Sequence, residues 1–257
     1  AELFRTADWS GGLLGSYSGT AQFDLTEFDT HYPVVTAWLD REFGASTRAR
    51  ARYDVGYAWV DYDGYLFNQE ATALLWHDWG RVGETELAAG YYWLDFKFDQ
   101  IDCLVGFFPD DCLDRDGDGL TAGVEHRIPV HDIHAVRAGF LFDRFWADGS
   151  EYDYSAYTFS LGFAAMLPLE LLLDVEGSYT YQPYDHPSFF TPFLAGFPFE
   201  AGDRRDDVWR VHAYLGRAIG QYVTVSAQYR YTNNQSNVAV YDYDRHVIGG
   251  YVTVYVR

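Results

Sequence analysis

Apolar and polar side chains alternate along this chain in segments of about 10 to 15 residues, and such segments recur from one end to the other. In residues 46–61, Tyr53 and Val55 share one face of an extended chain, while Arg50 and Arg52 share the other. A strand of this kind places one face in an apolar environment and the other in a polar one. Because no helical stretch interrupts the pattern, it predicts an all-β fold, a transmembrane antiparallel up-and-down β-barrel.

The alternating stretches between turn signals predict about twelve strands in a single outer-membrane β-barrel domain that covers 1–257. The connections alternate between short and long, as tight periplasmic turns and larger outer loops require. An even number of strands then places both termini on the periplasmic side. The expected strands are 9–24, 32–44, 46–61, 64–79, 83–98, 118–129, 132–146, 151–166, 169–183, 204–218, 221–233 and 240–256.

Composition favours a membrane location. Aromatic residues make up 19% of the chain, an excess that suits girdles at the two membrane–water interfaces. An aromatic-rich soluble β-sandwich is the open alternative. The net charge of −20 argues against nucleic acid, whose phosphates attract Lys and Arg. The expected partners are therefore outer-membrane lipid and a periplasmic or surface protein.

The segment 236–246, Ser-Asn-Val-Ala-Val-Tyr-Asp-Tyr-Asp-Arg-His, and the strand 247–256 after it resemble the last hairpin of a group of bacterial outer-membrane proteins. In that group a C-terminal β-barrel follows tetratricopeptide repeats, as in the surface lipoprotein assembly modifier type. Residues 151–154 and 123–126 also look like stretches of those barrels. The resemblance implies a Gram-negative outer membrane. A transport role that depends on periplasmic repeats does not carry over, because this sequence shows no repeat domain.

One motif matches the spacing of the calcium loop D-x-D-x-D-G-x5-E. Its flanks are not helical, and the residues from 120 onward have the pattern of a strand, which would aim Glu125 into the lumen. A calcium site and an acidic solvated turn therefore both remain open. The candidate ligands are Asp114, Asp116, Asp118, the carbonyl of Leu120, and Glu125.

Cys103 and Cys112 lie nine positions apart in the same expected loop. In an oxidising compartment they are expected to form a disulfide. The chain has no Cys-x-x-Cys-His haem attachment motif and no Gly-rich phosphate loop, so neither haem nor nucleotide is expected. No Ser stands beside a His in a pattern that suggests a catalytic triad, and we expect no enzymatic activity.

Charged residues of both signs fall on the face expected to line the lumen. They would either line a hydrated channel or pair into a ladder that fills the barrel. The function expected from these features is a transmembrane conduit, porin-like, for a solute or an exported macromolecule. The alternative is a plugged barrel that serves as a membrane anchor or scaffold for a periplasmic or cell-surface assembly. The expected lumen residues are Arg48, Arg50, Arg52, Asp54, Glu70, Glu86, Arg127, Arg137, Asp174, Glu176, Arg210 and Arg230.

Overall fold

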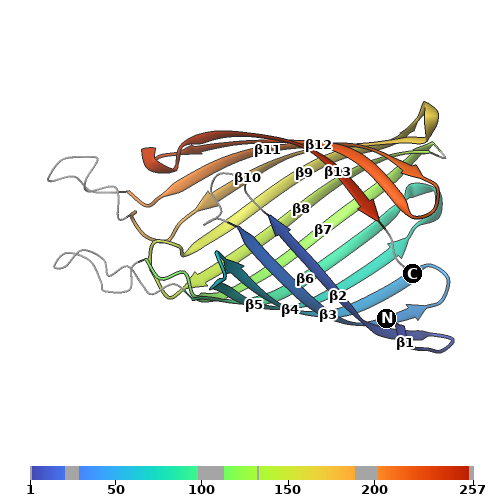
Figure 1. Cartoon of the computed structure of the whole chain (residues 1–257), viewed down its shortest axis with the longest axis horizontal. Coiled ribbons are helices and arrows are strands. Elements are labelled where there is room, and N and C mark those ends of the chain that lie inside the picture. The colour runs from blue at the N-terminus through green and yellow to red at the C-terminus, as the bar shows by residue number, and fades with distance from the viewer. Residues whose placement is uncertain (1, 21–28, 98–112, 132, 189–201, 255–257) are drawn as a thin grey trace, which may run out of the picture.

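A computed structural model describes residues 2–20, 29–97, 113–131, 133–188 and 202–254 of the chain. These residues form strands joined by turns, some of which contain a short 3₁₀ segment (Figure 1). The strands are β1 (Glu2–Arg5), β2 (Trp9–Thr20), β3 (Thr30–Phe43), β4 (Thr47–Val60), β5 (Asp63–Asp78), β6 (Glu84–Phe96), β7 (Gly117–His131), β8 (His134–Ala147), β9 (Tyr154–Leu167), β10 (Leu171–Pro183), β11 (Arg205–Ile219), β12 (Val223–Ser236) and β13 (Tyr243–Val254). The 3₁₀ segments are η2 (Gly80–Val82), η3 (Pro168–Glu170) and η4 (Ala239–Tyr241). Among the described residues, no helix is long and apolar enough to cross a membrane.

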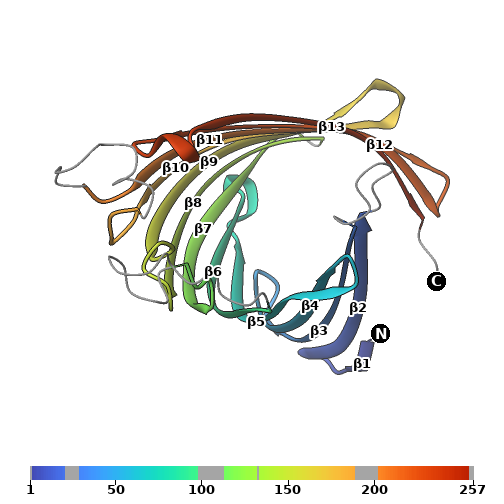
Figure 2. The ribbon, with the colours of Figure 1, turned by 60° about the vertical axis from the view of Figure 1, so that its left-hand side comes forward.

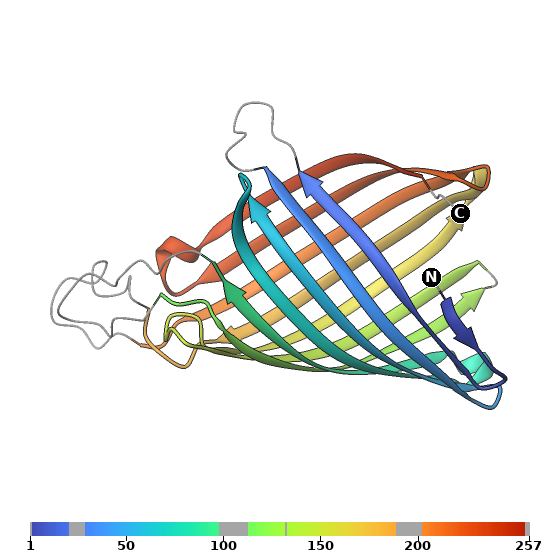
Figure 3. The same ribbon diagram turned by 60° about the horizontal axis from the view of Figure 1, so that its bottom comes forward.

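The strands form one 13-stranded sheet in which each strand pairs with the next in chain order. Every pairing is antiparallel, and the sheet curves around a central space (Figures 2 and 3). The predicted fold class, an all-β antiparallel up-and-down barrel, is confirmed. Strands β2 to β13 fall within a few residues of the expected ranges. The strand that the sequence did not predict is β1, whose four residues are too few to show a period.

The two ends of the sheet differ from the expected closed ring. Within the described residues, no pairing joins β13 to β1 or β2. β1 instead pairs with the start of β2, where Phe4 lies opposite Gly11 and Arg5 lies opposite Ser10. It therefore occupies part of the edge that ring closure would use.

Contacts that skip a strand identify the inner, concave face of the sheet. Arg137 on β8 hydrogen-bonds to Asp174 and Glu176 on β10, and it passes over Gly162 on β9. A Cβ atom at Gly162 would lie 2.6 Å from Nε of Arg137, so a side chain there would block the contact. Side chains converge only on a concave face, and cross-strand register then assigns the same face on every strand.

The opposite, outer face carries large apolar side chains that remain exposed. On β9, Phe159 is 55% exposed and Leu161 is 63% exposed, and both lie on the outer face. Exposed apolar surface on this scale is typical of a lipid-facing wall. The soluble β-sandwich considered above requires a second packed sheet, whereas all the described strands belong to one sheet.

Short and long connections gather at opposite ends of the sheet. The end that carries η2, η3 and the turn at Gly44 has short turns, and β1 lies near it (Figure 1). At the other end lie η4 and the connections that precede β7 and β11. The β4–β5 turn belongs to this end but is short, with Asp61 and Tyr62 in the left-handed region at φ of 49° and 65°.

Candidate functional site

The charged residues expected in the lumen all fall on the inner face. On β4, Arg50 lies opposite Leu74 of β5, and the same register continues through Ala88, Gly123 and Leu141. Side chains two positions apart on a strand share a face, and every expected lumen residue lies an even number of positions from an inner-face residue of its own strand. The structure thus brings to one surface Arg48, Arg50, Arg52, Asp54, Glu70, Glu86, Arg127, Arg137, Asp174, Glu176, Arg210 and Arg230.

Two arginines of β4 are engaged in ion pairs. Arg50 makes a bidentate pair with Asp40 on β3, with its Nε 2.5 Å from Oδ1 and its Nη2 2.7 Å from Oδ2. Arg52 has its Nε 2.6 Å from Oδ2 of Asp54 and its Nη2 3.9 Å from Oε1 of Glu70. The sequence did not single out Asp40, although it lies on the face of β3 opposite Val35 and Leu39 and is only 8% exposed.

Other inner-face arginines keep an unneutralised charge. Arg48 lies over the Trp76 ring, 4.2 Å from its centroid. Arg210 donates to Oγ1 of Thr180 and Arg230 donates to Oε1 of Gln228, both uncharged acceptors. In the part of the chain that the structure describes, none of these three arginines has a carboxylate within ion-pair distance. They remain fixed positive charges on the inner face.

Acidic side chains gather on the neighbouring strands. Glu86 on β6 and Glu125 on β7 lie directly opposite each other, and Nε1 of Trp76 donates to Oε2 of Glu86 at 2.5 Å. With Glu176 they line an inner-face hollow of about 270 Å³. The Arg137 guanidinium neutralises part of this charge, with Nη2 2.7 Å from Oδ1 of Asp174 and 2.8 Å from Oε2 of Glu176. The positive charge of Arg48 on β4 therefore stands apart from the carboxylates of Glu86 and Glu125 on β6 and β7.

An aromatic group bridges the inner face toward the long-connection end. The hydroxyls of Tyr92 on β6 and Tyr154 on β9 both donate to Asp143 on β8, at 3.0 and 2.9 Å. Phe145 stacks on the Tyr92 ring with centroids 5.9 Å apart. Gly119 on β7 makes room, because a Cβ there would lie 2.0 Å from that ring. No sequence pattern indicates this group, because its members come from different strands.

Arg204 is the centre of a second cluster, which we call the outer-end cluster: Glu151, Tyr184, Ser188, Arg204, Asp206 and Tyr241. The Arg204 side chain is 8% exposed, and its Nη2 lies 2.6 Å from Oδ2 of Asp206. Its guanidinium stacks against the rings of Tyr184 and Tyr241, at 4.1 and 3.3 Å from their centroids. Oε1 of Glu151 accepts hydrogen bonds from Ser188 and Tyr241, both at 2.7 Å.

The ionisation of this cluster follows from its burial. Burial raises the pKa of Tyr184 and, together with the hydrogen bond to Glu151, that of Tyr241, so both phenols stay protonated and able to donate. For Arg204, burial is the largest single effect and lowers the pKa, but the hydrogen bond to Asp206 and the electrostatic interactions with Tyr184, Asp206 and Tyr241 together raise the net pKa. The Arg204 guanidinium therefore stays charged, and the cluster around it links the β8–β9, β10–β11 and β12–β13 connections.

The calcium motif does not close into a loop. Glu125 lies within β7, seven positions after Asp118, which on an extended strand is about 23 Å away. Oδ1 of Asp116 accepts from the Phe96 amide at 2.6 Å, and Oδ1 of Asp114 accepts from the Asp116 amide at 2.9 Å. Over the described ranges, no group of three or more His, Cys, Asp or Glu side chains is placed to hold a metal ion.

The charges around Asp116 still repel one another. Burial raises the pKa of Asp116, as do the nearby charges of Asp114, Asp95 and Asp148, while the hydrogen bond from the Phe96 amide lowers it. Calcium binding by Asp114, Asp116, Asp118 and the Leu120 carbonyl stays a prediction. Cys103 and Cys112, with their expected disulfide, lie outside the described residues.

No protein-family model matches the chain, and no curated protein matches it. Among solved structures, the chain is similar to the β domain of the Bordetella autotransporter BrkA, with a TM-score of 0.39 and 15% sequence identity, covering 96% of this chain and 98% of that chain. The resemblance to barrels that follow tetratricopeptide repeats stays a prediction.

Proposed function

We propose that this chain is an outer-membrane β-barrel that forms a transmembrane conduit for a hydrophilic solute or an exported macromolecule. The observation that carries the proposal is the contrast between the two faces of one sheet. Adjacent residues of β9 illustrate it, since Ser160 lines the acidic inner hollow while Leu161 is 63% exposed on the outer face. A wall that is apolar outside and charged inside suits a polar pathway through lipid.

The proposed orientation places the short turns and both termini in the periplasm. The supporting observation is the segregation of connections, because outer-membrane barrels have short periplasmic turns and longer outer loops. The outer-end cluster around Arg204 and the carboxylates of Asp114 and Asp116 would then face the outside of the cell. Lipid is the expected partner of the outer face, and we propose no enzymatic activity.

The second candidate is a plugged barrel that anchors or scaffolds an assembly. Specific contacts favour it: Arg137 and Tyr92 each span a strand to pair with residues two strands away. Such bridges fill an interior in small barrels. The two candidates differ in whether ions can pass.

Conductance across planar bilayers separates them. We expect purified, folded protein to give sustained single-channel current steps. The substitution Arg48→Glu replaces an inner-face cation, which has no carboxylate partner among the described residues, by an anion. Cation selectivity should therefore increase, and the reversal potential in a KCl gradient should move toward the potassium equilibrium potential.

The matched control is Arg217→Gln, which removes a cation from the outer face of β11, where Arg217 lies opposite Leu171 and Val225. It should leave the reversal potential unchanged. Absence of current steps from well-folded protein would contradict the conduit and support the anchor. Equal shifts in the two variants would show that the inner face does not line the pathway.

A further inference from the structure

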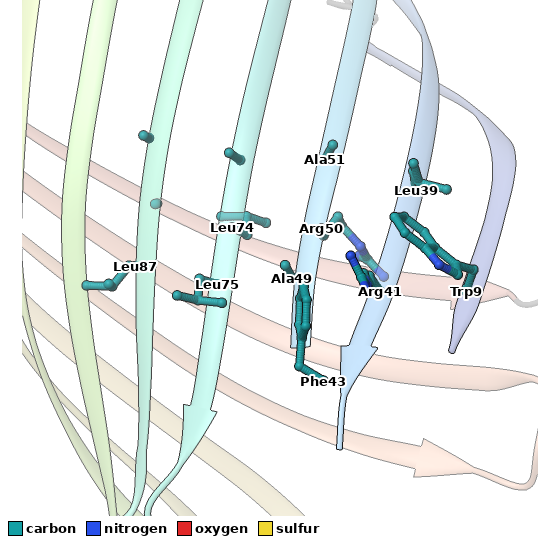
Figure 4. A pocket seen from close by; sticks show the side chains of 13 residues that line it. Trp9, Leu39, Arg41, Phe43, Ala49, Arg50, Ala51, Leu74, Leu75 and Leu87 are labelled. Carbon is teal, nitrogen blue, oxygen red and sulfur yellow. The ribbon is translucent and has the colours of Figure 1, made fainter. Parts of the chain in front are cut away.

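The outer face carries an apolar hollow of about 560 Å³ near the short-turn end (Figure 4). Its floor consists of Ala51, Ala73 and Ala89, which lie opposite one another on β4, β5 and β6. Leu75 and Leu87 form its rim on the side of the short turns. The larger side chains around the floor make this part of the outer face concave.

The hollow is long enough for a single hydrocarbon chain. A second hollow of about 660 Å³ shares the three floor alanines and continues toward Tyr53 and Tyr91. From Leu39 on β3 to Ala89 on β6 the hollow spans three strand spacings, about 14 Å, measured across the strands. One acyl chain covers about half of the roughly 30 Å hydrocarbon core of a bilayer, so most of a chain fits on this surface when it lies obliquely to the membrane normal.

A cation lines the same hollow. Arg41 on the outer face of β3 lies between the rings of Trp9 and Phe43, with its guanidinium carbon 5.0 and 4.6 Å from their centroids (Figure 4). Within the described residues, no carboxylate pairs with Arg41. The neighbouring Arg50 points to the inner face and is paired with Asp40. Arg41 therefore offers a fixed guanidinium to an anion at the edge of an apolar hollow.

We propose that this hollow binds a glycerophospholipid of the periplasmic leaflet, with the phosphate on Arg41 and one acyl chain on the alanine floor. The inference rests on the proposed membrane placement and orientation. Arg41 is close to the turn at Gly44, at the short-turn end, where the periplasmic headgroups would lie. Trp9 and Phe43 are the aromatic side chains expected at that interface.

Charge and shape together favour a phospholipid over a protein partner. The hollow provides one positive charge at one edge and an apolar floor behind it, which matches one phosphate joined to one hydrocarbon chain. A stable protein interface buries at least about 1,000 Å² and carries several polar contacts. Two arginines, Arg41 and Arg50, lie at the hollow. Arg50 extends to the inner face, where it pairs with Asp40, so Arg41 supplies the positive charge on the outer face.

Native mass spectrometry of the protein in mild detergent, titrated with phosphatidylglycerol, tests the proposal. We expect wild type to retain one phospholipid. Arg41→Gln should weaken binding about tenfold, the loss of one charge-assisted contact. The double substitution Ala73→Leu/Ala89→Leu fills the floor and should abolish the retained lipid without removing any charge. Diacylglycerol and glycerol phosphate, which each carry half of the ligand, should bind more weakly than the phospholipid.

Matched controls use the same substitutions elsewhere on the outer face. Arg217→Gln removes an outer cation on β11, and Ala227→Leu enlarges an exposed outer alanine on β12. Both should bind phospholipid as wild type does. Equal binding by wild type, Arg41→Gln and the floor-filling variant would overturn the lipid site while bilayer insertion stays intact. Failure of wild type to insert into bilayers would instead overturn the membrane placement on which the site depends.

Discussion

At the scale of single residues, Arg204 is the group on which the outer-end cluster depends. Replacing it with Met keeps a side chain of similar length but removes the cation. Asp206, which is 3% exposed, would then lose its ion pair, and Glu151, also 3% exposed, would lose its nearest positive charge. Leaving buried charge uncompensated costs about 3 to 5 kcal/mol. Arg204→Met should lower the free energy of unfolding by that amount in urea titrations of protein reconstituted in lipid vesicles.

The adjacent Arg205 provides the control. Its side chain is 57% exposed, and its Nε lies 3.4 Å from Oδ2 of Asp207. Solvent screens such a pair, so Arg205→Met should cost less than about 1 kcal/mol. A loss of equal size in both variants would show that the burial of Arg204 contributes nothing beyond a surface ion pair.

Sequence patterns predicted inner-face residues well and missed the outer-end cluster for a physical reason. Arg48, Arg50 and Arg52 sit at every second position of one strand, so their common face follows from the period of the backbone. Arg204 and Tyr184 lie at the two ends of the β10–β11 connection, and Tyr241 comes from the β12–β13 connection. No local period relates residues in turns, so only the tertiary fold brings them together.

At the scale of elements, the β9–β10 turn is made of residues that disfavour its conformation. Leu169 and Glu170 have φ of 65° and 58°, in the left-handed region where a Cβ costs about 1 to 2 kcal/mol. The connection is the three-residue segment Pro168–Glu170, and Asn and Gly are the residues that adopt positive φ in turns most readily. Leu169 is 72% exposed, so replacing it loses little packing. The double substitution Leu169→Asn/Glu170→Gly should raise the free energy of unfolding by about 1 to 2 kcal/mol.

The reverse change in another turn at the same end gives the control. Gly220 in the β11–β12 turn has φ of 66°, and nothing lies within 4 Å of a Cβ built there. Gly220→Ala should therefore destabilise through backbone strain alone, by about 1 kcal/mol. If the Asn-Gly variant unfolded at a lower urea concentration than wild type, turn strain would not limit stability here.

Element boundaries were predictable because apolar and polar residues alternate through most of each strand. At the calcium motif this alternation, and not the local motif, determines the structure. In a calcium loop Gly119 would stand at the sharp turn, although the sequence also predicts a strand from residue 118. In the structure Gly117 and Gly119 begin β7, and a Cβ at Gly117 would lie 2.2 Å from the Trp146 carbonyl oxygen. Close packing against neighbouring strands explains both glycines, and the strand carries Glu125 away from the aspartates.

At the scale of the whole molecule, the sheet is apolar outside and charged inside, the inverse of a soluble sandwich. Ser160 and Leu161 test this directly, because they are neighbours on β9 with opposite faces. An arginine near the bilayer midplane on the lipid face costs about 2 to 4 kcal/mol. Leu161→Arg should therefore lower the free energy of unfolding from vesicles by about that amount.

Ser160→Arg introduces the same charge one position away and should cost much less. Ser160 lines the inner hollow with Glu125 and Glu176, so an arginine there has both space and carboxylate partners. In a soluble sandwich the order would be reversed, because the exposed position would tolerate the charge and the inner one would bury it. Measured in the same vesicles, a larger loss for Ser160→Arg than for Leu161→Arg would contradict a lipid-facing outer wall, whereas the expected order supports a charged interior enclosed by an apolar wall.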